Sequence, residues 1–461
     1  MSTAACEGKT RKIWRAGTLT YTTAGIVGLF CLLLWGDFAW GLKERSVGFV
    51  AGLMVKSYGI SNFWYGALLT SYPCFTNIFL MPAISFWSDR YRSRLGRRIP
   101  FLLFTTPFVV AGLLGLAATP MLGTWLQNAV GADVLSLNMA RLCWFILFWG
   151  ILDFGTTCTN ALFVALANDV VPPELIGRFL ALFRMMSLLC AVLFNSCILG
   201  YAETHAPYIF LGLGIFYAVG LYTLCLKVKE GSYPPPDENA GAVPHTVPQA
   251  VKLYFRECFA LPYYRWVIIG YSLCGHSVLA VNTYVIFFAT KDLGLQLDFF
   301  GKLTACIFGG AFLLSFLWGY LADRFHPIRV GMTAIFLLAI VQLIAGFAIR
   351  DKFTFVLFFV LHESTMMSFN TLMASYPQRL FPKAYFAQFN SALMMIYAVL
   401  AVLLAPIFGW ILDLLNSQYR YVFTIGAVLA LSGFCCLARV YWYFLKYGGD
   451  ANYRAPEVRD R

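Results

Sequence analysis

Isolated ionisable side chains inside long apolar runs are the residues of this sequence that could do chemistry. Asp153, Thr157 and Asn160 are spaced i, i+4, i+7, so they share one face of a helix. Arg184 and Asn195 are eleven residues apart and lie within about 20° of each other around a helix. An ionised group near the bilayer centre costs about 2.5–3.5 kcal/mol, so it is retained where water, a partner or a ligand compensates it. We expect a polyhydroxylated ligand with bridging water to lie between Asp153 and Arg184.

Further candidates lie in other apolar runs. Asp37 and Glu44 are seven residues apart and share a helix face, whereas Lys43 and Arg45 point elsewhere. A carboxyl group in a low dielectric can have its pKa raised towards neutrality, which suits a group that binds a coupling cation. We expect this role for Asp37, Glu44, Asp153 or Glu363. The residues expected to bind the substrate are Asp37, Trp149, Asp153, Asn160, Arg184, Asn195, Glu363 and Asn370. For each the alternative is a structural role: aromatic residues at helical spacing, such as Trp149, are usually core or belt residues.

The composition requires lipid as the solvent. Hydrophobic residues make up 60% of the 461 residues and charged residues only 12%, too little polar surface for a soluble globule. The net charge of +12 comes from basic residues in loops between apolar runs, which does not fit nucleic-acid binding. The 13 cysteines lack metal-site spacing, so neither a metal site nor a disulfide framework is expected. The first apolar run has no cleavage site and is expected to be retained.

Twelve apolar runs predict an all-α integral membrane protein with twelve transmembrane helices in two six-helix halves. The first run, residues 17–55, would be about 58 Å long as one helix, so it must tilt, kink or stop near Lys43. Residues 120–138 are expected to form an outer loop. The other helices are expected near residues 62–86, 100–119, 139–167 and 178–200, then up to 227, and near 265–289, 299–321, 328–349, 353–376, 385–412 and 420–445.

The loops predict domain limits and orientation. Residues 228–262 contain three successive prolines from Pro234 and a basic amphipathic stretch near 251–259, typical of a linker with one interfacial helix. The halves would be residues 1–227 and 263–447, followed by a solvated tail, 448–461. Arg and Lys gather in alternate loops, above all in the turn from Asp89 to Arg98, which places both termini in the cytoplasm.

An internal repeat supports the two halves. Trp87-Ser-Asp89-Arg90 recurs as Leu321-Ala-Asp323-Arg324. A shift of 210 positions lays Asp153 and Asn160 over Glu363 and Asn370, and Pro172 over Pro382. Acid, amide and proline therefore coincide where a six-helix duplication would put them.

The turn from Asp89 to Arg98 resembles the signature loop of the major facilitator superfamily, and this likeness extends over nearly the whole chain. More narrowly, Ser88-Asp-Arg-Tyr-Arg-Ser-Arg-Leu-Gly-Arg-Arg-Ile-Pro100 resembles plant sucrose transporters and the glycoside-pentoside-hexuronide:cation symporters. Phe148-Trp149-Gly-Ile-Leu-Asp153 with Asp169 is similar to helix 4 of sucrose transporters, although Val164 stands where those carry a basic residue. Melibiose permease, of the symporter family, is similar in its acids and arginine in helices 1, 4 and 5, matched here by Asp37, Asp153 and Arg184.

The resemblance implies that charged residues at the ends of helices form a cytoplasmic gate, although such charges could also serve only to set topology. The expected gating residues are Asp89, Arg90, Gly96, Arg97, Arg98, Asp169, Asp323 and Arg324.

We expect a secondary active transporter, namely a sugar:cation symporter that couples to H⁺ or Na⁺ and works by alternating access as a monomer. It would lie in the plasma membrane, or in the inner membrane of a bacterium. An efflux carrier for amphipathic solutes is the alternative within transport. A membrane sensor or scaffold would need a signalling domain, and the tail after Gly448 is short for one. An intramembrane enzyme is disfavoured because no nucleophile–base pair, phosphate-binding loop or metal cluster is visible, and no cofactor is expected.

Overall fold

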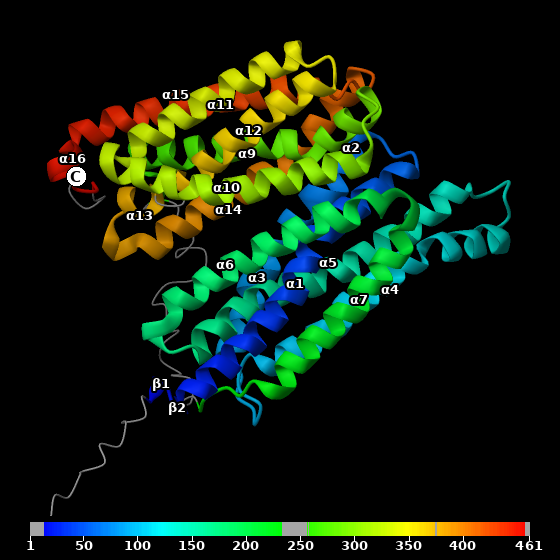
Figure 1. Cartoon of the computed structure of the whole chain (residues 1–461), viewed down its shortest axis with the longest axis horizontal. Helices are drawn as coiled ribbons and strands as arrows, with labels where there is room; N and C mark the ends of the chain where they lie inside the picture. Colours follow the sequence, from blue (N-terminus) through cyan, green and yellow to red (C-terminus); the bar gives the residue numbers. More distant parts are fainter. Residues whose placement is uncertain (1–12, 233–255, 257, 374–375, 457–461) are drawn as a thin grey trace, which may run out of the picture. The chain divides into compact units, whose positions relative to one another are not determined.

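The computed structural model describes residues 13–232, 256, 258–373 and 376–456 (Figure 1). It begins with a hairpin of two short antiparallel strands, β1 (Trp14–Ala16) and β2 (Leu19–Tyr21), in which Trp14 lies opposite Tyr21. Gly17 takes a positive φ of 55° in the turn between them, a conformation that glycine adopts without strain. The first helix therefore begins at Thr23 rather than at Gly17 as predicted.

Helices make up nearly all of the remaining structure. Up to residue 227 they are α1 (Thr23–Ser57), α2 (Asn62–Gly66), the π-helix η1 (Ala67–Ser71), α3 (Tyr72–Arg90), α4 (Ile99–Val130), α5 (Leu137–Val170), the 3₁₀ turn η2 (Pro173–Leu175), α6 (Ile176–Leu193), the π-helix η3 (Phe194–Ile198), the 3₁₀ turn η4 (Leu199–Tyr201) and α7 (Ala202–Lys227). The first helix runs through Lys43 without stopping, which excludes one of the three predicted solutions to its length.

The second series of helices follows the linker. It comprises α9 (Pro262–Phe287), the π-helix η5 (Phe288–Asp292), α10 (Leu297–Phe325), α11 (Pro327–Ala348), α12 (Lys352–Met373), α13 (Tyr376–Leu380), the 3₁₀ turn η6 (Lys383–Tyr385), α14 (Phe386–Leu414), α15 (Tyr421–Lys446) and α16 (Gly449–Asn452). The interfacial helix predicted near residues 251–259 lies largely outside the described residues.

Twelve membrane crossings account for these helices. By length and hydropathy, the described residues contain nine candidate spans, one of which, Pro173–Lys227, holds both α6 and α7. The helices α10 and α12, with 29 and 22 residues, are also long enough to cross a bilayer. The predicted all-α fold with twelve transmembrane helices is confirmed.

The predicted repeat has a structural counterpart. Pro172 precedes the 3₁₀ turn η2 with φ −56° and ψ 137°, and Pro382 precedes η6 with φ −58° and ψ 128°. In each case the turn leads directly into a long helix, α6 or α14. The two prolines that a shift of 210 superimposes in sequence therefore occupy the same backbone geometry.

The chain packs as two compact units. One contains Met1–Ala51, Phe79–Ala191 and Thr204–Asp237, and the other contains Gly52–Ile78, Val192–Glu203 and Glu238–Arg461. These limits differ from the halves predicted from sequence, because two segments from before residue 228 pack with the second unit: α2 and η1 on α14, and η3 and η4 on α10.

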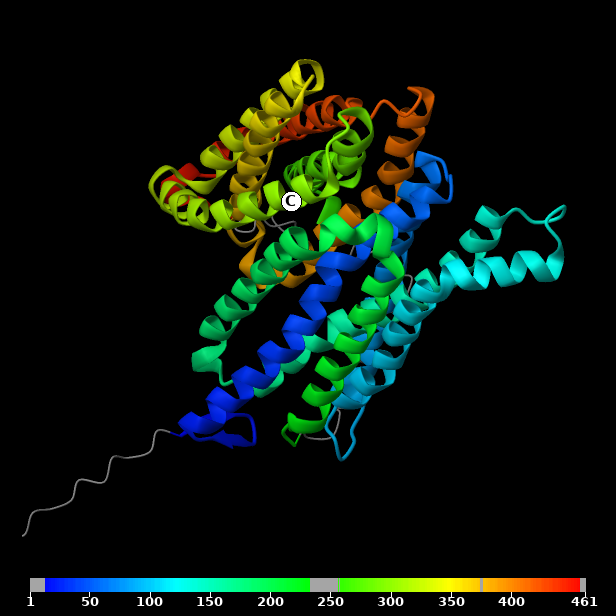
Figure 2. The same cartoon turned by 45° about the vertical axis from the view of Figure 1, so that its right-hand side comes forward.

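In the first unit, α4 and α5 form an antiparallel hairpin along their whole length, and their far ends extend past α7 (Figure 2). The predicted outer loop at residues 120–138 is wrong, since α4 continues through Pro120 to Val130 and only residues 131–136 separate the two helices. The packing of α5 supports α4 beyond Pro120.

Glycines allow this hairpin to pack closely. A Cβ atom at Gly112 would lie 2.6 Å from Leu152 Cβ and 2.8 Å from the Leu152 backbone nitrogen, and one at Gly115 would overlap the ring of Phe148. Small residues at such helix interfaces let the two backbones approach closely, which increases van der Waals contact between the helices. In lipid this contact matters because the hydrophobic effect does not drive helices together.

The tail after Gly448, predicted to be solvated, packs on the second unit as far as it is described. The Tyr453 hydroxyl donates to the Leu380 carbonyl at 2.7 Å, and the Tyr264 hydroxyl donates to the Pro456 carbonyl at 2.7 Å. Asp450 pairs with Arg329 at 2.8 Å. The polar composition of the tail concealed this docking, which depends on its tyrosine and proline and on one acid.

Replacement of Gly112 by Ala should destabilise the protein by about 1–3 kcal/mol, because the added methyl group meets backbone atoms of α5 that cannot move aside. The measurement is the midpoint of thermal unfolding in detergent. Gly212→Ala in α7 is the matched control, since nothing lies within 4 Å of its added Cβ. Equal midpoints for the two variants would contradict this role of Gly112.

Candidate functional site

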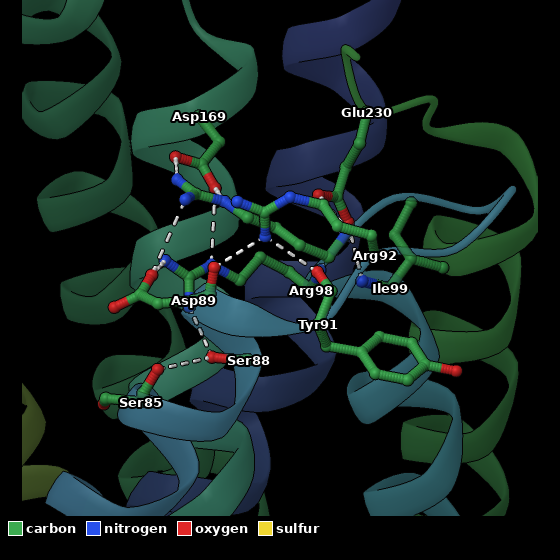
Figure 3. Close-up of polar contacts among 10 residues, drawn as sticks. Ser85, Ser88, Asp89, Tyr91, Arg92, Arg98, Ile99, Asp169 and Glu230 are labelled. Carbon is green, nitrogen blue, oxygen red and sulfur yellow. Dashed lines mark hydrogen bonds and ion pairs between the residues drawn. The ribbon is translucent and has the colours of Figure 1, made fainter. Parts of the chain in front are cut away.

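A cluster of arginines and acids joins three helix ends of the first unit (Figure 3). Arg97 binds Asp169, in the last turn of α5, through two hydrogen bonds of 2.9 and 2.5 Å. Arg98, which precedes α4, binds Asp89 and Ser88 of α3 and reaches Asp169 at 3.3 Å. A bidentate arginine–carboxylate pair is among the stronger polar contacts in proteins. The cluster therefore fixes α3, α4 and α5 to one another.

Glu230, just after α7, completes this cluster. Its carboxylate accepts the backbone N–H groups of Arg97, Arg98 and Ile99 at 2.9, 2.8 and 2.7 Å. These N–H groups lie at the start of α4, where Arg98 is the N-cap residue and Ile99 the first helical residue, and such groups have no partner inside the helix. A negative charge is favoured there by the helix dipole. Gly96 allows the approach, because its φ is 108° and a Cβ would lie 2.5 Å from Glu230 Cβ.

Sequence reasoning missed Glu230, since it stands at the start of the predicted linker, 131–133 residues from the groups it binds. One signal was available in the sequence. The helix expected after Gly96 has no acidic residue in its first turn. Such a helix end needs an acceptor from elsewhere in the chain.

Two other predicted gating residues, Arg90 and Arg324, contact aromatic side chains. Arg90 stacks on the ring of Phe86, with its guanidinium carbon 3.5 Å from the ring centroid. Arg324 donates to the hydroxyl of Tyr320 at 3.3 Å. The side chain of Asp323 lies outside the described residues.

A second polar group lies within the membrane-spanning part of the first unit. Lys43, only 2% exposed, forms an ion pair of 2.9 Å with Glu44 and lies 3.4 Å from the hydroxyl of Thr156. Trp40 donates its indole N–H to Asn160 at 2.6 Å. The expectation that Lys43 points away from Glu44 is therefore wrong: its long side chain bends back to the neighbouring carboxylate, because a buried ammonium group needs a partner.

Of the carboxylates predicted to bind a cation in the first unit, Asp37 and Asp153 are buried, whereas Glu44 is exposed. Asp37 is 1% exposed, and neither carboxylate oxygen has a hydrogen-bond partner among the residues that the structure describes. Asp153 is also buried, as is Thr157 one turn further along α5. Trp149 is buried and stacks on Phe145, with ring centroids 5.9 Å apart, as a core residue would.

Arg184 and Asn195 do not share the environment predicted for them. Arg184 is exposed, whereas Asn195 is buried and stands in η3. The prediction that both lie on one polar stripe assumed an unbroken α-helix. The wider π turn that begins at Phe194 changes the angular position of every later side chain.

The second unit holds the remaining candidates on α12. Glu363 is buried, and its Oε1 lies 3.9 Å from Nε2 of the buried His362. Asn370, two turns further along, borders a cavity of about 280 Å³. The other lining residues are Tyr271, Gly275, Phe369, Met373, Met394 and Tyr397. One amide among aromatic and thioether side chains is the usual composition of a small-molecule pocket.

No set of three His, Cys, Asp or Glu side chains within the described ranges could hold a metal ion. The polar groups found above are single acids, ion pairs and amides set into membrane-spanning helices.

Comparison with solved structures agrees with this fold. The chain is similar to a bacterial homologue of the human lysosomal transporter Spinster (TM-score 0.64, 14% identity, 94% of this chain and 98% of that one). It is also similar to a bacterial homologue of the iron transporter ferroportin (0.66, 15%, 90% and 99%) and to a D-xylose–proton symporter (0.63, 15%, 95% and 99%). No curated protein sequence matches.

Fold and polar groups together define a multi-pass membrane transporter of the major facilitator superfamily, not an enzyme. A family model described as "MFS/sugar transport protein" matches residues 36–379, and the chain belongs to this family.

Replacing Glu230 by Ala should lower the free energy of unfolding by about 1–3 kcal/mol, because three N–H groups of α4 lose their acceptor. Thermal unfolding in detergent measures the loss. Glu203→Ala, at an exposed acid in the first turn of α7, is the control. A Glu230 variant as stable as the control would rule out the capping role.

Proposed function

We propose that the protein is a secondary active sugar:cation symporter that works by alternating access and couples to H⁺ or Na⁺. The observation that carries the proposal is Asp37, a carboxylate in a membrane-spanning helix that is 1% exposed and has no hydrogen-bond partner among the described residues. Such a group is costly in the membrane unless it is protonated or binds a cation. Binding and release of that cation would couple the gradient to the solute.

The substrate side of the proposal rests on amides and aromatic rings. Asn370 with Tyr271 and Tyr397 offers hydrogen bonds and ring faces to a solute of sugar size. Asp153 and Arg184 would supply a carboxylate and a guanidinium group, both suited to hydroxyl groups. The family description and the likeness to a D-xylose–proton symporter favour a sugar over other solutes.

The proposed orientation places both termini and the cluster of Arg97, Arg98 and Asp169 on the cytoplasmic side of the plasma membrane, because short loops rich in arginine stay inside. In this setting the cluster would hold the ends of α3, α4 and α5 in one arrangement during the cycle. A monomer suffices, since each chain would contain its own pathway.

An efflux carrier for amphipathic solutes is the second candidate. Phe369, Met373 and Met394 supply apolar, adaptable surface to the same cavity. Such a carrier would move dyes or lipophilic cations and would show no competition by sugars.

Uptake of labelled sugars into proteoliposomes, with and without imposed pH and Na⁺ gradients, tests the function. Asp37→Asn and Asp153→Asn should each abolish accumulation, reducing it at least about tenfold, because the neutral amide cannot take up the coupling ion or its charge. Asp351→Asn, at an exposed acid in a loop, is the control that should accumulate normally. Accumulation by both membrane variants at the control level would contradict the proposed coupling.

Replacing Asn370 by Ala should raise the KM for a transported sugar by about tenfold while the response to the gradient persists, because the cavity loses its one amide. Initial uptake rates over a range of sugar concentrations give the value. An unchanged KM, with inhibition by amphipathic solutes and not by sugars, would favour the efflux carrier.

A further inference from the structure

Asp413, near the end of α14, binds the start of α2 in the second unit. Its Oδ1 accepts the backbone N–H of Asn62 at 2.9 Å and the Asn62 side-chain N–H at 2.9 Å. Its Oδ2 accepts the backbone N–H of Phe63 at 2.9 Å. One carboxylate therefore fixes both the backbone and the side chain at the beginning of the helix.

Asn62 is fully buried, and its side chain uses its full hydrogen-bonding capacity. Its Oδ1 accepts from Lys56 Nζ at 2.6 Å and from the Tyr419 hydroxyl at 3.1 Å. Its Nδ2 also donates to Ser417 Oγ at 2.9 Å, and its backbone carbonyl accepts from the Tyr284 hydroxyl at 3.1 Å. A polar residue held from four elements in this way specifies one arrangement of them.

Tyr419 is a dependable donor in this network. Burial raises the pKa of Tyr419 to about 12, so the phenol keeps its proton at neutral pH. This hydrogen bond to Asn62 therefore persists over the physiological range.

Close backbone contact continues from this network along α14. A Cβ atom at Gly409 would overlap the Asn62 carbonyl, and one at Gly66 would overlap the Ala405 carbonyl. The Ser71 hydroxyl donates to the Val402 carbonyl at 2.7 Å. Successive residues of α2 and η1 thus contact α14 in antiparallel order, with no room for a solute between the helices.

Residues 52–78 belong by sequence to the first six helices, yet they are fixed to α14 of the last six. Alternating access moves the two sets of six helices relative to each other, so this contact must open in every cycle. We propose that Asp413 and Asn62 form a latch, which closes the transport pathway at the α1–α2 end and must be broken before the pathway opens there. This inference rests on the proposed transport function.

The test measures how often the contact opens. Ser71→Cys places a thiol where Ser71 is buried against α14, and its alkylation rate, followed by mass spectrometry of the peptide that contains it, reports the fraction of open molecules. Adding Asp413→Asn should raise that rate about tenfold or more, since charge-assisted hydrogen bonds are lost. Asp298→Asn, which removes an exposed ion pair with Lys302, is the matched control and should leave the rate unchanged.

Tyr419→Phe, which removes one hydrogen bond of the network, should give a smaller increase and can be measured if the Asp413 variant does not fold. Alkylation at the control rate in every latch variant that folds would overturn the proposal. The readout needs no substrate, so a faster rate combined with no sugar uptake would retain the latch and reject the symporter.

Discussion

The structure depends on one constraint: a charged or strongly polar group that leaves water must be compensated inside the protein. Asp169 is shared by Arg97 and Arg98, and Lys43 is paired with Glu44. The Glu230 carboxylate accepts hydrogen bonds from otherwise unsatisfied backbone N–H groups and, within the described part of the chain, does not pair with a cation there. The 12% of charged residues in this apolar chain is therefore concentrated at helix ends and at a few internal positions where a partner lies within reach.

The same constraint separates structural from functional groups. In the cluster around Asp169, each acid meets an arginine or a row of N–H groups, so the cluster is complete without a ligand. Asp37 differs, because it is more deeply buried than Asp89 or Asp169 and has no such partner among the described residues. In the proposed function, the coupling ion would bind where the compensation of a buried charge is incomplete, and this contrast is the basis of that proposal.

The sequence predicted the fold in detail where hydropathy decides the outcome. The end of α7 at Lys227 falls at the predicted residue, and the limits of α11 and α15 lie within a residue or two of those expected. Errors arose where packing overrides local signals: α4 continues through Pro120 because α5 supports it, and Tyr453 fixes a tail that composition makes polar.

The site was predicted less completely, for geometric reasons. Asp37, Asp153 and Glu363 could be proposed as candidates because an acid in an apolar run is visible without a structure, and the structure shows all three to be buried. The role of Glu230 depends on contacts across more than 130 residues, and no local pattern encodes them. The environment of Asn195 depends on the π-helix η3, and the sequence contains no proline or glycine there that would indicate one.

The docked tail also determines when the second unit can complete its folding during synthesis. The hydroxyls of Tyr263 and Tyr453 meet across 190 residues, and Tyr264 finds its carbonyl acceptor across 192. At about 5–20 residues per second, a ribosome needs roughly 10–40 s to supply these partners after the start of α9 has emerged. During that interval the start of α9 lacks its final contacts with the tail. Insertion chaperones would therefore have access to the start of α9 for longest.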